Sequence, residues 1–106
     1  MSKLVKKIAG LCYDVNKLYY DEKDEKVKEE LKDRFEKLSK LLEKAIISQF
    51  DENDIVYKDA IKKINTVNRK IKKVKENLQK TEKIFVYLSE LIENIDTLLR
   101  EAKLFK

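Results

Sequence analysis

One stretch of sequence decides the fold of this chain. It runs from Ala60 to Ala102 and reads AIKKINTVNRKIKKVKENLQKTEKIFVYLSELIENIDTLLREA. Alternating steps of four and three positions pick out a row in which only Thr81 is not apolar, and such spacing keeps one side of a helix directed at a partner helix. The stretch therefore predicts helical packing of the coiled-coil type. The row comprises Ala60, Ile64, Val67, Ile71, Val74, Leu78, Thr81, Phe85, Leu88, Ile92, Ile95, Leu99 and Ala102.

The composition indicates helix throughout the chain. Of its 106 residues, 42% are charged and 42% are hydrophobic, and there is no proline and a single glycine, Gly10. Proline and glycine are the residues that disfavour helices most strongly. The length suits one domain with one core, which we expect to cover residues 1–106. The predicted fold class is all-α, an antiparallel helical hairpin or bundle.

The apolar pattern divides into four predicted helical segments. Continuing the first apolar row beyond residue 20 would bury carboxylates, so we expect a turn or a strong kink at 20–24. The polar stretch 49–54 is the clearest loop, because it ends in residues that cap helices. Phe50 within it is expected to fold back onto the end of the bundle. The segments are about 3–20, 25–48, 53–80 and 82–105.

The sequence allows two arrangements of the last two segments. Nothing from Gln79 to Glu82 breaks a helix, and the apolar row continues through Thr81 without a shift. One helix of around 50 residues would be on the order of 75 Å long. A turn near Thr81 would instead give four similar helices in a compact bundle. The unbroken row favours the single long helix.

Charge is distributed unevenly along the chain. The formal net charge is +5, and lysine supplies all but three of the 25 basic residues. Residues 21–54 hold twelve acidic and eight basic side chains, whereas residues 55–83 hold ten basic and three acidic ones. We expect the second and third segments to pair antiparallel, because a short loop joins them and opposite flanking charges favour that pairing.

Most of the side chains used in catalysis or metal binding are missing. Histidine is absent and Cys12 is the only cysteine, so the commonest general base and any Cys/His zinc site within one chain are excluded. A single glycine cannot form a glycine-rich phosphate loop. We expect a protein that is not an enzyme, with no catalytic residue, no metal site, no cofactor and no small-molecule substrate. Cys12 is interpreted as a buried structural thiol rather than a redox-sensitive one.

The sequence predicts no segment that crosses a membrane. No run approaches the ~20 apolar residues that a spanning helix needs. The basic beginning resembles that of a signal peptide, but Lys6, Lys7 and Asp14 interrupt its apolar positions. We therefore expect a cytoplasmic location.

A lysine-rich face within residues 58–83 is one candidate binding surface. Basic stripes bind the phosphates of nucleic acids or an acidic partner. The acidic second segment is expected beside it, however, and no DNA-binding motif or aromatic stacking platform accompanies it. Nucleic-acid binding is therefore the alternative function. The candidate residues are Lys58, Lys62, Lys63, Arg69, Lys70, Lys72, Lys73 and Lys75.

An apolar surface for self-association is the other candidate. The first and fourth segments carry broader apolar rows than the middle two, and a long hairpin would leave part of those rows open to water. Because soluble monomers rarely expose such a patch, we expect a homodimer or a protein partner to cover it. The predicted function is thus a non-enzymatic protein–protein interaction or self-association. The surface comprises Val5, Cys12, Tyr19, Ile84, Leu91 and Leu98.

Overall fold

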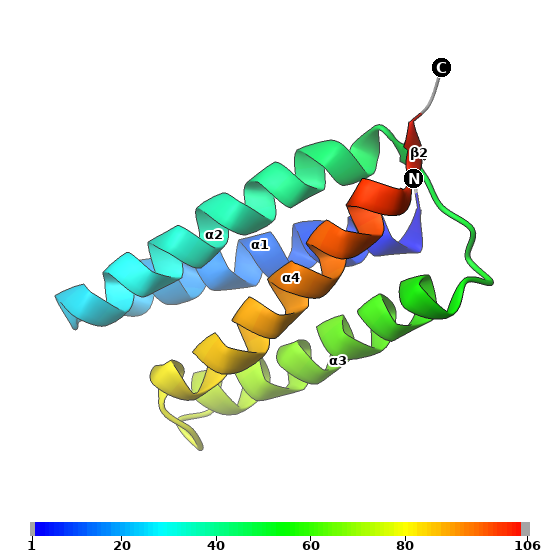
Figure 1. The fold of residues 1–106 in the computed structure, drawn as a ribbon. Coiled ribbons are helices and arrows are strands. Elements are labelled where there is room, and N and C mark those ends of the chain that lie inside the picture. Colours follow the sequence, from blue (N-terminus) through cyan, green and yellow to red (C-terminus); the bar gives the residue numbers. More distant parts are fainter. Residues whose placement is uncertain (1, 105–106) are drawn as a thin grey trace.

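The computed structural model describes residues 2–104 and confirms the all-α class, as a bundle of four helices that measures 44 × 21 × 20 Å (Figure 1). Residue 105, where the last predicted segment ended, lies outside the described residues. Coiled-coil packing in the strict sense stays a prediction. The elements are α1 (Lys3–Asp21), α2 (Glu25–Ile46), β1 (Ser48–Gln49), α3 (Ile55–Lys75), the 3₁₀ turn η1 (Thr81–Ile84), α4 (Phe85–Glu101) and β2 (Lys103–Leu104).

Polar side chains set the beginnings of the first three helices. Ser2, Asp24 and Asp54 each accept a hydrogen bond from a backbone N–H two or three residues farther along, at 2.9–3.1 Å. These bonds satisfy amide groups that a helix leaves without an internal partner. The predicted turn at 20–24 and the predicted loop at 49–54 both contain such a cap and are confirmed.

The break after α3 shows that the single long helix favoured above is wrong. Asn77 has a φ of 60°, its N–H donates to the carbonyl of Val74 at 3.0 Å, and the N–H of Leu78 donates to the carbonyl of Lys73 at 2.9 Å. Together these bonds form a Schellman motif, the common way to end a helix with one left-handed residue. The chain then reverses, and α4 folds back along α3 (Figure 1).

The order of the helices around the bundle also differs from the prediction. Helix α1 packs beside α2 and α3, and α4 also packs beside α2 and α3, so that α2 and α3 lie diagonally opposite. The expected direct pairing of the second and third segments is therefore wrong. The broad apolar rows of α1 and α4 each cover two neighbours, and the loop between α2 and α3 crosses the diagonal. Helices α1 and α3 run in the same direction (Figure 1).

The core contains nearly all of the apolar row in the quoted stretch. Leu78 is the exception, 72% exposed beyond the end of α3, and Ile92 is half-buried. Phe50 folds back as predicted and packs against Tyr57, with ring centroids 5.6 Å apart. In the part of the chain described, no helix is both long and apolar enough to cross a membrane.

A short strand pair closes one end of the bundle. Strands β1 and β2 are antiparallel, with Ser48 opposite Leu104 and Gln49 opposite Lys103. The predicted second and fourth helices extended into these residues, so both predicted ends were too late. Ser48 is buried and its hydroxyl donates to the carbonyl of Lys44 at 2.6 Å.

Candidate binding surfaces

The residues predicted to form a self-association surface lie in the core instead. Val5, Cys12, Ile84, Leu91 and Leu98 are at most 7% exposed, and Tyr19 is half-buried against the same core. The prediction assumed a long hairpin whose broad rows stay open to water. Because α4 folds back along α3, these rows are covered within one chain, and that argument for a dimer no longer holds.

Cys12 is buried, as the sequence predicted. Burial raises the pKa of its thiol, and the hydrogen bond with the Ser39 side chain offsets only part of that rise. The thiolate is the reactive form of cysteine, so a raised pKa keeps this thiol protonated and unreactive at neutral pH. The structure thus favours a packing role for Cys12.

The predicted basic residues of α3 divide into two groups and Lys75, which lies against α1. Lys63, Lys70 and Lys73 lie toward α4, where the Lys70 ammonium stands 3.9 Å from the centroid of the Tyr87 ring. The others form an exposed or half-buried row that repeats the four-and-three spacing of the apolar row on another side of the helix. This outer row of α3 comprises Lys58, Lys62, Asn65, Arg69 and Lys72.

Helix α1 contributes a matching row beside it. Lys7 donates to the Asn65 side chain at 2.7 Å, and Lys75 pairs with Asp14 at 2.9 Å. These two contacts bring the polar side of α1 against the outer row of α3. The row on α1 has the same spacing and comprises Lys3, Lys7, Gly10, Asp14 and Lys17.

The two rows together form a surface that we call the basic face. Sequence reasoning found its α3 half but missed its α1 half, although the spacing of the α1 lysines carries the signal. Its cations are Lys3, Lys7 and Lys17 of α1 with Lys58, Lys62, Arg69 and Lys72 of α3.

Charge is separated between the two sides of the bundle. Helix α3 holds eight basic side chains and one acidic one, and its neighbour α1 holds four lysines and two aspartates. Helix α4 holds four acidic side chains and one arginine. Helix α2 carries six acidic and seven basic residues, because half of the twelve acids of residues 21–54 lie outside it, in the flanking turns and at the end of α1. The prediction that the second segment is the acidic neighbour of α3 is wrong, because α2 lies diagonally opposite and the acidic helix beside α3 is α4.

Most cations on α3 form no ion pair with the carboxylates of residues 2–104. Lys72 reaches Glu76 only at 4.0 Å, and Lys75 pairs with Asp14. Within residues 2–104, Lys58, Lys62 and Lys63 make no ion pair. Unpaired cations crowded on one helix repel one another and are neutralised most effectively by a bound polyanion.

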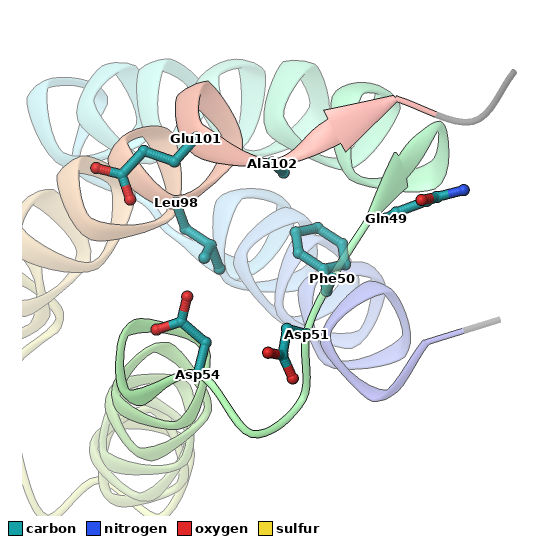
Figure 2. Close-up of a pocket in the computed structure, with 7 residues that line it drawn as sticks. All are labelled: Gln49, Phe50, Asp51, Asp54, Leu98, Glu101 and Ala102. Carbon is teal, nitrogen blue, oxygen red and sulfur yellow. The ribbon is translucent and has the colours of Figure 1, made fainter.

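One hollow of about 360 Å³ lies at the strand-pair end of the bundle (Figure 2). Phe50 and Leu98 face it, and the carboxylates of Asp51, Asp54 and Glu101 stand around it (Figure 2). Asp51 and Asp54 already accept backbone N–H bonds, which they use to shape the loop and to cap α3. Across residues 2–104 no group of three or more side chains is arranged to hold a metal ion.

Two exposed tyrosines lie away from the basic face. Tyr13 and Tyr20 are 69% and 72% exposed and stand seven positions apart on α1. Tyr20 packs edge-on against Tyr19, and Lys28 of α2 covers the Tyr19 ring at 4.7 Å from its centroid. The tyrosines therefore belong to the α1/α2 side of the bundle.

Comparison with family models, with curated proteins and with solved structures finds no match to this chain.

Proposed function

We propose that this chain is a non-enzymatic protein that binds nucleic acid through the basic face. The observation that carries the proposal is the adjacency of α1 and α3, two helices that run in the same direction with basic rows side by side. Each row alone is a solvated helix surface. Together they bring seven cations and one carboxylate, Asp14, onto one side of the bundle, and such an excess of cations is the electrostatic requirement for binding phosphates.

The structure changes the balance between the two functions predicted from sequence. Self-association depended on six residues, of which five are buried in the core. Part of the case against nucleic acid was an acidic second segment beside α3. Helix α2 instead lies diagonally opposite α3, and the basic helix α1 lies along the seam that Lys7 and Asn65 mark, while the acidic helix α4 packs on the other side of α3. The predicted self-association surface and the expected pairing of α3 with the second segment are thus both removed, whereas the lack of a known DNA-binding motif still stands against the proposal. A nucleic acid is also the partner whose charges recur regularly along a line, as the cations of the outer row do.

Salt-dependent binding tests this proposal directly. A fluorescently labelled oligonucleotide of mixed sequence is titrated with the protein, and its anisotropy is followed from about 50 to 200 mM salt. We expect the affinity to fall by roughly a hundred-fold or more over that range, since each neutralised phosphate releases a counterion. Absence of binding at the lowest salt would overturn the proposal.

A pair of charge-matched variants locates the binding surface. In the outer-row variant, Lys58, Lys62, Arg69 and Lys72 are changed to Gln. In the control variant, four exposed lysines of α2 are changed to Gln, which gives the same net charge. We expect the outer-row variant to lose at least ten-fold in affinity and the control to lose much less. Equal losses would show that net charge, rather than the basic face, drives binding. The control residues are Lys26, Lys32, Lys40 and Lys44.

A further inference from the structure

We infer that the basic face recognises the backbone of a nucleic-acid duplex, without regard to base sequence, in preference to a single strand. This inference rests on the proposed function and specifies its ligand. Three observations support it: the straightness of the rows, the absence of exposed aromatic rings between them, and the kind of cation they carry.

The rows are straight and of equal length. Lys3 to Lys17 and Lys58 to Lys72 each span about 21 Å at the rise of an α-helix, and neither crosses a turn. A duplex presents one phosphate per roughly 1.7 Å of its axis, so such a row can lie along a backbone that holds its charges in fixed positions. A row of cations on a formed helix suits the phosphates of a duplex, because the backbones of both partners are ordered before they bind.

The face offers no platform for unpaired bases. Proteins that bind single strands stack the bases on exposed aromatic side chains. The exposed rings of α1, Tyr13 and Tyr20, lie on its α2 side, and Tyr87 of α4 is covered by Lys70. In both rows of the basic face, as residues 2–104 present them, no position holds an aromatic side chain.

The cations of the basic face are mostly lysines, which supply charge rather than directed hydrogen bonds. Lysine is a solvated point charge, whereas arginine forms the bidentate bonds that read guanine. Arg69 is the single arginine among the seven cations of the face, and it donates to the Thr66 hydroxyl at 3.1 Å. Asp14, which is paired with Lys75, is the acidic residue within the two rows, and Glu76 near Lys72 and Asp59 next to Lys58 border them. Contacts from such a surface position a backbone and carry no sequence information.

The test compares a labelled duplex of about twenty base pairs with its own labelled strand at one salt concentration. We expect the duplex to bind at least about ten-fold more tightly, and duplexes of two unrelated sequences to agree within about two-fold. Changing Lys62 and Lys72 to Gln should remove about two phosphate contacts. The slope of log affinity against log salt concentration should therefore become less steep by about 1.8. Changing Lys32 and Lys40 of α2 in the same way should leave that slope unaltered.

The outcomes separate this inference from the proposed function. Equal or tighter binding of the single strand would overturn the duplex preference while leaving nucleic-acid binding in place. A more than ten-fold difference between two duplex sequences would overturn the backbone-only mode of recognition. If neither the duplex nor the single strand binds at the lowest salt concentration, the proposed function is overturned. Poly-glutamate is the further control: binding as tight as that of the duplex would indicate an acidic protein partner and overturn both proposals.

Discussion

Helix α3 carries two rows of side chains with the same spacing and opposite chemistry. The inner row, from Ala60 to Val74, is buried against α1 and α4, whereas the outer row, from Lys58 to Lys72, faces water. Regular spacing therefore shows only that residues share one side of a helix. The side chains decide whether that side is covered, since apolar groups gain by leaving water and unpaired charges do not. The two rows can be separated by experiment.

The largest expected effect is from emptying the inner row. Ile64 is fully buried, so Ile64→Ala should lower the free energy of unfolding by about 2–5 kcal/mol, the usual range for a core cavity. Urea denaturation followed by circular dichroism measures the loss. Ile46→Ala is the matched control, because Ile46 is 53% exposed and its loss should stay within about 0.5 kcal/mol. Equal losses at both sites would mean that the inner row is wrongly assigned.

Removal of a polar contact at the edge of the inner row should cause the next largest loss in the free energy of unfolding. The Tyr57 hydroxyl is buried and accepts the backbone N–H of Leu4 at 3.2 Å. Tyr57→Phe leaves that N–H without a partner and should cost about 1–3 kcal/mol. Tyr13→Phe, at a ring that is 69% exposed, should change little. The same denaturation measurement checks both, and a loss at Tyr57 no larger than at Tyr13 would contradict the prediction.

Substitution of Gly10, in the α1 row of the basic face, should have a smaller effect on the free energy of unfolding, and should raise it. A Cβ atom added there meets no heavy atom within 4 Å. Gly10→Ala should therefore stabilise the protein by about 0.5–1 kcal/mol, through helix propensity alone. The neighbouring Ala9→Gly should lower stability by a similar amount. A loss of stability in Gly10→Ala would reveal a contact between α1 and α3 that the structure does not contain.

The outer row should have the smallest effect on stability. Removing the charges of Lys58, Lys62, Arg69 and Lys72 should shift the free energy of unfolding by less than about 0.5 kcal/mol, because exposed charges contribute little to folding. Thermal and urea denaturation of the outer-row variant provide the measurement. If this variant unfolds, the outer row also stabilises the fold, and the two rows do not differ in the way described.

Sequence reasoning predicted the helices well, because their signals are local. The apolar row and the caps at Asp24 and Asp54 depend on residues a few positions apart. The break after α3 also has a local signal, since asparagine tolerates the left-handed conformation that ends a helix. Asn77 was overlooked because the apolar row continues past it. Leu78, the position that seemed to extend that row, is 72% exposed.

The binding surface was only half predictable, because it depends on which helices are neighbours. The basic residues of α3 are evident from their number, but the contribution of Lys3, Lys7 and Lys17 requires α1 to lie beside α3. A short connection between α2 and α3 suggested that those two helices pair. Their actual diagonal placement follows from the need to cover two broad apolar rows at once, which is a property of the whole bundle.

The strand pair at the end of the bundle has a consequence for the order of folding. The α1/α2 and α3/α4 hairpins each close through a short turn, so they can form early and independently. Strands β1 and β2 come from different hairpins, and Gln49 can meet Lys103 only after both hairpins have docked. This pairing requires the closure of a long loop for very few hydrogen bonds. We therefore expect it to be the last contact to form and the first to open, so that the exchange of its amide hydrogens would report whether the two halves of the molecule are joined.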